Sequence, residues 1–224
     1  MQRKVLSLLA LLAMVAGTAV CGRAAALGAS PSLQEPPLRI SEPLDVVVAD
    51  LESFDPDYLD RQDIPGAAIA LVRDGNVVWT EGFGVANTIT RRPVTADSTF
   101  ELASNDKVVT AYIALRLVDL GMLSLDEPLN TYLQEPWLPP SEYRDAISLR
   151  HVLSHTSGLG HLTTSRESLF APGRGYSYSA VGYRYLQAVL EEVSGQPLEE
   201  LAQEMVFEPL GMHSSSFVNH TGMG

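Results

Sequence analysis

Cysteine is nearly absent from this chain of 224 residues, since Cys21 is its one example. A disulfide framework and cysteine-based metal or thiol chemistry are therefore excluded. Positive charge is also scarce: 15 Lys and Arg face 27 Asp and Glu, for a formal net charge of −12. An acidic protein repels nucleic acid and anionic membrane surfaces, so the composition argues against DNA or RNA as a partner.

The N-terminus carries a basic pair followed by the apolar run from Val5 to Cys21 and the small residues Ala24–Ala26. This order predicts a secretory signal peptide over residues 1–26, and hence export to the periplasm or outside the cell. The run is also just long enough to span a bilayer, so an uncleaved membrane tether is the alternative. Cleavage would remove Cys21 and three basic residues, leaving a net charge of −15.

Residues 27–43 are rich in Pro, Ser and Ala and predict a flexible linker. We expect one folded domain over residues 44–224, beginning with a helix at residues 45–54. Two apolar runs, 67–73 and 76–82, are joined by Asp74-Gly75, a strong hairpin signal. After Ser104 the pattern becomes mainly helical. A helix is expected over residues 180–193, ahead of Gly195.

Ser104 and Lys107 form the pattern S-x-x-K at the expected start of a helix. One helical turn brings both side chains to one face. A serine hydroxyl is a poor nucleophile unless a neighbouring base takes its proton, and a lysine can do so or pass the proton on. Alone, this pattern occurs often by chance in a helix start with a solvated lysine.

The helix after Ser104 carries an apolar stripe that ends before Gly121, a residue suited to a helix C-terminus. We expect this helix to be mostly buried, so the polar side chains at its start should face a cleft. The stripe comprises Val108, Val109, Tyr112, Ile113, Leu115, Val118 and Leu120.

Six segments in fixed order, within residues 44–212, resemble the serine β-lactamase and penicillin-binding family. The resemblance is strongest to its branch of class C β-lactamases, D,D-peptidases and family VIII esterases. The order of the matches is far more specific than any one of them. They are Asp63–Ala68, Ser104–Lys107, Leu123–Pro128, Leu149–Leu159, Pro172–Ala180 and Pro209–Met212.

The resemblance implies an α+β fold of the β-lactamase/transpeptidase type, in which an antiparallel sheet packs with helices beside a mainly helical subdomain. It implies that Ser104 is the acylated nucleophile, Lys107 its proton partner and Tyr178 the phenol that works with the lysine as general base. The implied reaction hydrolyses a small amide, β-lactam, D-amino-acid peptide or ester, including peptidoglycan-like substrates. It requires no metal or organic cofactor.

Two departures from the family pattern stand out. The second family motif is Tyr-x-Asn, but this chain has Tyr178-Ser179-Ala180, which weakens a β-lactamase assignment more than an esterase one. The third motif, Lys or His followed by x-Gly, should come much later, and the segment at 219–222 imitates it only by chance. We therefore expect the chain to be an N-terminal portion that holds the first strands and the helical part.

Four nearby residues receive weaker interpretations. Tyr176 could be mistaken for the catalytic phenol, but the spacing from Pro172 favours Tyr178. His151 and His155 lie four apart without the acidic residue of a zinc motif, and we expect His155 to bond backbone at the following turn. The carboxylate of Asp106 is expected to point away from the cleft.

Two alternatives to an active hydrolase stay open. Ala180 and the missing third motif also fit a catalytically inactive module of the same fold, which binds a peptidoglycan or peptide ligand without turnover. The chain could also be a non-functional fragment with an uncovered sheet edge.

Overall fold

A computed structural model describes residues 42–53, 56–161 and 165–218. The chain divides into two compact units, residues 1–55 and 56–224. In the first unit, α1 (Leu44–Glu52) confirms the helix predicted at residues 45–54, but it begins one residue earlier and ends before its C-cap Ser53. The predicted signal peptide and almost all of the predicted linker lie outside the described residues. In the described part of the chain, no helix has both the length and the apolar character needed to cross a membrane.

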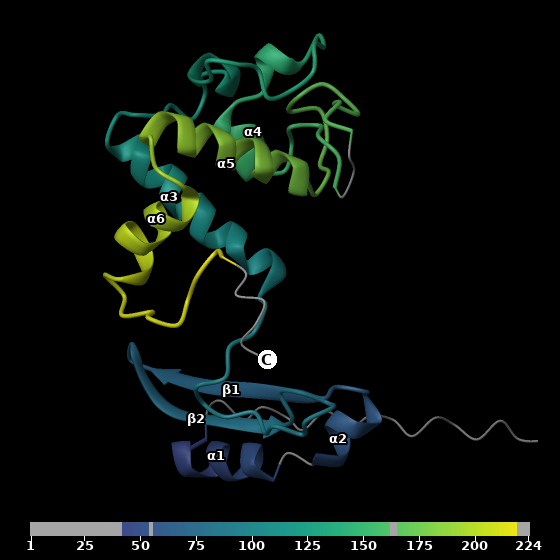
Figure 1. The fold of residues 1–224 in the computed structure, drawn as a ribbon, viewed down its shortest axis with the longest axis vertical. Helices are drawn as coiled ribbons and strands as arrows, with labels where there is room; N and C mark the ends of the chain where they lie inside the picture. The colour runs from purple at the N-terminus through teal and green to yellow at the C-terminus, as the bar shows by residue number, and fades with distance from the viewer. Residues whose placement is uncertain (1–41, 54–55, 162–164, 219–224) are drawn as a thin grey trace, which may run out of the picture. The chain divides into compact units, whose positions relative to one another are not determined.

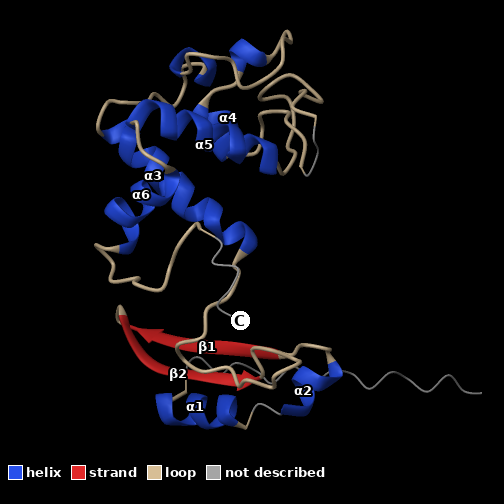
Figure 2. Cartoon of the chain, viewed as in Figure 1, coloured by secondary structure: helices blue, strands red, loops and turns tan. Residues whose placement is uncertain are grey.

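The second unit begins with α2 (Pro56–Arg61) and a two-stranded antiparallel sheet. Strand β1 (Gly66–Arg73) pairs with β2 (Asn76–Gly84), from Gly66 opposite Gly84 to Arg73 opposite Asn76 (Figure 2). The register shifts by one residue between Leu71 and Val72, as at a β-bulge. Asp74 and Gly75 both have positive φ, 52° and 76°, as a two-residue hairpin turn of type I′ requires. The predicted hairpin is confirmed.

The rest of the second unit is mainly helical, and its longest helices are α3 (Asp106–Asp119) and α5 (Ala180–Ser194). Helix α3 contacts both α5 and α6 (Leu198–Ala202), while α4 (Leu149–Leu153) packs on α5 (Figure 1). A π-helical turn, Gln203–Phe207, continues α6. Short 3₁₀ turns lie at Ala103–Asn105, Leu129–Tyr132 and Arg144–Ala146.

Glycines in the left-handed conformation follow both long helices, as the sequence predicts. Gly121 has φ 73° and donates its N–H to the carbonyl of Val118 at 2.9 Å. Gly195 has φ 71° and donates to the carbonyl of Glu191 at 2.9 Å. Both glycines satisfy helix-end carbonyls that would otherwise lack a partner.

Leucine-rich contacts between the helices form the core of this region. The side chains that are fully excluded from solvent come from α3, α4, α5, α6 and the loops between them. Burial of each Leu, Ile or Val side chain among them contributes about 1.5–3 kcal/mol before the entropy cost of ordering. They are Ile113, Ala114, Leu129, Ile147, Leu149, Leu159, Tyr185, Leu186, Val189, Leu190, Leu201 and Ala202.

The predicted burial of the α3 stripe is wrong for one side of the helix. Ile113, with Ala114 and Leu117, enters the core, whereas Val108 is 71% exposed, Tyr112 49% and Leu115 43%. These three residues follow each other at helical spacing and form an apolar strip on the surface. Both sides of α3 are apolar, so periodicity could not decide which side the other helices cover.

The loop that leads into α4 is tied to the segment after α3. Leu129 N–H donates to the carbonyl of Ile147 at 2.9 Å, and Arg150 N–H donates to the carbonyl of Leu125 at 2.9 Å. The Arg150 guanidinium also bonds both carboxylate oxygens of Asp126, at 2.7 and 2.9 Å. The backbone bonds fix the start of α4, after which His155 reaches the candidate site.

Candidate functional site

Ser104 and Lys107 meet where the 3₁₀ turn Ala103–Asn105 runs into α3. The Lys107 ammonium donates a hydrogen bond from Nζ to Ser104 Oγ at 3.2 Å. The Lys107 side chain is only 14% exposed, so its charge is partly shielded from water. The helical spacing predicted from the sequence therefore brings the serine hydroxyl and the lysine ammonium into contact.

The backbone just before Ser104 is strained. Ala103 has φ 47°, a left-handed conformation that costs a residue with a side chain about 1–2 kcal/mol. Strain of this kind persists where the surrounding structure determines the conformation, and it is frequent at functional sites. Here it sets the path by which the chain enters the turn that holds Ser104.

Tyr178 reaches the same place from the loop before α5. Its ring centroid lies 5.6 Å from Lys107 Nζ, within the range of a cation–π contact. A hydrogen bond from Ser104 lowers the pKa of Tyr178 below its usual value, and the hydrogen bond and positive charge of Lys107 act in the same direction, against the raising effect of burial. This environment favours the phenolate.

Tyr176 lies away from this contact. Its side chain is 71% exposed, and its ring meets the edge of the His155 ring at 6.0 Å. Of the two tyrosines, Tyr178 is therefore the one whose ring lies beside Lys107.

Asp106 does not point away as expected. Its carboxylate Oδ1 lies 3.4 Å from Lys107 Nζ, and its side chain is half exposed. The negative charge offsets part of the ammonium's effect on the phenol, since Asp106 raises the pKa of Tyr178 while Lys107 lowers it. The physical reason is the length of the lysine side chain, whose Nζ contacts both Ser104 and the neighbouring Asp106.

Tyr183, which the sequence analysis did not single out, is a further neighbour of the lysine. It lies on the first turn of α5, and its ring centroid is 5.6 Å from Lys107 Nζ. Burial, with the negative charges of Tyr178 and Asp106, raises the pKa of Tyr183. Tyr183 is thus a neutral phenol, whereas the surroundings of Tyr178 favour the phenolate. An aromatic one turn into the helix after Tyr178 was the signal that could have identified it.

His155 bonds backbone, but in a different segment from the one expected. Its ring Nδ1 accepts the N–H of Ser179 at 3.1 Å, not a group in the turn at residues 156–158. His151 lies apart from it, with Nδ1 at 3.1 Å from Ser148 Oγ in the capping box of α4. In the described residues, no three His, Cys, Asp or Glu side chains gather as metal ligands would.

The position of the family's missing asparagine is held by the first residue of α5. Ala180 offers no amide there, and it is half buried. The preceding Ser179 is 1% exposed, accepts the N–H of Gly182 at 2.8 Å and donates to the carbonyl of Gly160 at 2.8 Å. Ser179 therefore caps the helix and anchors the end of the segment that carries Tyr178.

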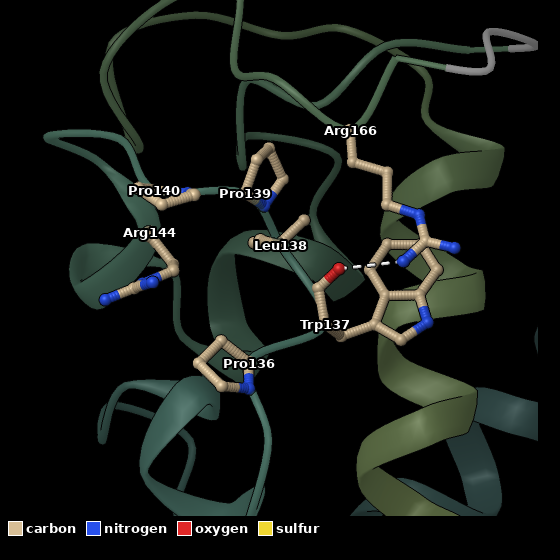
Figure 3. A pocket seen from close by; sticks show the side chains of 7 residues that line it. All are labelled: Pro136, Trp137, Leu138, Pro139, Pro140, Arg144 and Arg166. Atoms are coloured by element: carbon tan, nitrogen blue, oxygen red, sulfur yellow. Dashed lines mark hydrogen bonds between the residues drawn. The ribbon is translucent and has the colours of Figure 1, made fainter.

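The helical region has a surface cavity that is separate from this cluster. Ser104, Lys107 and Tyr178 do not line it. It has a volume of about 520 Å³ (Figure 3). On one side the Arg166 guanidinium lies 3.8 Å from the ring centroid of Trp137 and donates to the Trp137 carbonyl at 2.8 Å. The lining residues are Pro136, Trp137, Leu138, Pro139, Pro140, Arg144 and Arg166.

The chain is similar in sequence to proteins of known family. The sequence profile of the family described as "Beta-lactamase" matches residues 51–221. Esterase EstB of Burkholderia gladioli is 31% identical over 199 residues, which cover 74% of this chain and 50% of the esterase. Penicillin-binding protein 4 of Amycolatopsis lactamdurans is 32% identical over 176 residues, covering 68% of this chain and 44% of that protein.

A solved structure agrees in fold. The octameric penicillin-binding protein homologue from Pyrococcus abyssi superposes with a TM-score of 0.65 at 28% identity, covering 74% of this chain and 43% of that one. The chain thus spans half the length, or less, of these relatives. The segment at 219–222 that imitates the third motif lies outside the described residues.

Proposed function

Because this chain belongs to the beta-lactamase family, whose profile matches residues 51–221, we propose that it is a serine hydrolase that forms an acyl-enzyme on Ser104. One observation carries the proposal. Lys107 Nζ lies 3.2 Å from Ser104 Oγ and 5.6 Å from the ring centroid of Tyr178, which comes from a distant segment of the chain. A hydroxyl and a phenol gathered around one cation supply the nucleophile, the base and the positive charge that acyl transfer requires.

In the acylation step, the Ser104 hydroxyl attacks a carbonyl carbon and its proton passes to the Tyr178 phenolate. The Lys107 ammonium stabilises that phenolate before attack and can relay the proton to the leaving group. Ser104 and Lys107 both lower the pKa of Tyr178, which suits the phenol to accept this proton.

In the deacylation step, water attacks the Ser104 ester. Tyr178 takes a proton from the water, and the proton returns to Ser104 Oγ as the acyl group leaves. The negative charge on the carbonyl oxygen requires N–H donors. The N–H of Ser104, at the start of the turn that leads into α3, is proposed as one of them.

The proposed substrates are small esters, amides, β-lactams and D-amino-acid peptides, including peptidoglycan-like molecules. An ester is favoured, because Ala180 replaces the amide of the family motif and a relative is named an esterase. Export, or a membrane tether, is proposed from the apolar N-terminal run alone.

The test combines chemical labelling with substitution. The full chain is treated with a fluorophosphonate probe, and the adduct is mapped by peptide mass spectrometry. We expect one adduct, on Ser104. Ser104→Ala should lose both the adduct and hydrolysis of p-nitrophenyl acetate, while the control Ser98→Ala, which removes a hydroxyl that contacts the Thr95 turn, should retain both. Equal turnover by Ser104→Ala and the wild type would disprove the mechanism.

A second candidate function is favoured by Ala180. Without the amide that orients lysine and substrate in the family motif, the chain could bind a peptide or penicillin ligand without turnover. This reading predicts saturable binding of a labelled penicillin that remains in Ser104→Ala, together with no fluorophosphonate adduct on the wild type. The hydrolase proposal predicts the reverse for the adduct.

A further inference from the structure

His155 contacts the backbone on both sides of Tyr178. Its carbonyl oxygen accepts the N–H of Ser177 at 2.9 Å, and its ring Nδ1 accepts the N–H of Ser179 at 3.1 Å. N–H groups two residues apart point the same way in extended chain, so one residue can take both. The peptide groups that flank Tyr178 are therefore held by a single residue.

The His155 ring also packs directly on the phenol. The two ring centroids lie 4.5 Å apart at an interplanar angle of 40°, and Tyr183 lies 5.4 Å away on another side. His161 meets the Tyr178 ring at 5.0 Å. The backbone and the side chain of Tyr178 are thus both restrained. In the proposed function, this restraint holds the Tyr178 hydroxyl toward Ser104.

The hydrogen bond fixes the tautomer of His155. A backbone N–H can only donate, so Nδ1 must be the unprotonated nitrogen and the neutral ring carries its hydrogen on Nε2. Burial, and secondly the positive charge of Lys107, lower the pKa of His155, which keeps the ring in this accepting form at neutral pH. Protonation at Nδ1 would place two donors against each other and break the contact.

The backbone of His155 adopts an unfavourable conformation to make these contacts. Its φ is 56°, in the left-handed region, directly after the end of α4. Asn, Asp and His are enriched there among residues with side chains, and glycine is free of the steric cost. From these observations we infer that His155 is a positioning residue, which holds Tyr178 against Ser104 by clamping Ser177 and Ser179. The inference rests on the proposed function.

Two variants separate the clamp from the fold. His155→Gly removes the ring acceptor and is comfortable at φ 56°, while His155→Asn is tolerated there and keeps an acceptor in its amide oxygen. We expect kcat for p-nitrophenyl acetate to fall about 10- to 100-fold in His155→Gly with KM nearly unchanged, since misplacement of a reacting group by about 1 Å costs up to about 100-fold. His155→Asn should stay within about fivefold of the wild type.

Hydrogen exchange at the amide of Ser179 measures the bond between this N–H and His155, and it does not depend on turnover. Exchange should be faster in His155→Gly and protected in His155→Asn. The control His151→Asn changes a residue of α4, and it should leave the exchange unaltered. Equal kcat for His155→Gly and the wild type, or equal losses in the Gly and Asn variants, would overturn the inference.

Failure of the clamp and failure of the proposed function give different results. If the wild type shows no turnover and no Ser104 adduct, the hydrolase proposal fails, and the clamp is then judged by exchange at Ser179 alone. Unchanged exchange in His155→Gly would overturn the clamp even in an active enzyme.

Discussion

Replacement of Ser179 by alanine should destabilise the helical region by a predictable amount. The Ser179 hydroxyl accepts the N–H of Gly182 at the start of α5, and loss of such a helix cap costs about 1 kcal/mol. The same hydroxyl donates to the carbonyl of Gly160, which is buried and would lose a partner at a cost of about 1–3 kcal/mol. The sum is about 2–4 kcal/mol of unfolding free energy.

The assay is urea unfolding followed by far-UV circular dichroism, with a thermal melt beside it. For a chain of this size, about 2–4 kcal/mol corresponds to a melting temperature lower by about 4–16 °C. The matched control is Ser177→Ala, two residues earlier, because the described structure shows no hydrogen bond from the Ser177 hydroxyl. An unchanged midpoint in Ser179→Ala, or an equal drop in the control, would refute the reasoning.

Three further predictions concern charge at the site. Because hydrogen bonding to Ser104 lowers the pKa of Tyr178, the rate of hydrolysis should rise with pH and level off below pH 10. Tyr178→Phe should lose this rise in rate, and the control Tyr176→Phe should keep it. Asp106→Asn removes a negative charge that raises the pKa of Tyr178. Ester turnover at pH 7 should therefore increase about twofold to fivefold, the size of effect that one exposed charge can have. A decrease would contradict this role. Burial lowers the pKa of His155, so the unfolded chain protonates this imidazole at a higher pH than the folded chain does. The free energy of unfolding should therefore decline as pH falls below about 6.5. Parallel urea titrations should show a smaller decline in His155→Asn.

Local sequence signals were sufficient for the parts of the fold that depend on neighbouring residues. Asp74-Gly75 identified the hairpin because few other residues allow two positive φ angles in a row. Helical spacing likewise placed Lys107 beside Ser104. Tyr178 joined the site only through the family resemblance, since no local rule connects it with a serine on another helix.

Features that depend on packing between distant segments could not be predicted. The sequence marked His155 as a backbone-bonding residue, but its partner at Ser179 is 24 positions away. The exposed strip on α3 was missed for the same reason, because Val108 and Ile113 are equally apolar and only the positions of α5 and α6 distinguish their sides. The orientation of Asp106 depended on how Lys107 bends, which spacing does not specify.

The two tryptophans of the chain offer separate optical reports on its two kinds of structure. Trp79 lies in β2, 6.5 Å from the Phe83 ring, whereas Trp137 lies in the helical region between Arg166 and Tyr185. A Trp137→Phe protein would fluoresce from the hairpin alone and a Trp79→Phe protein from the helical region alone. Their emission during a melt would reveal whether strands and helices unfold in one cooperative transition or in two.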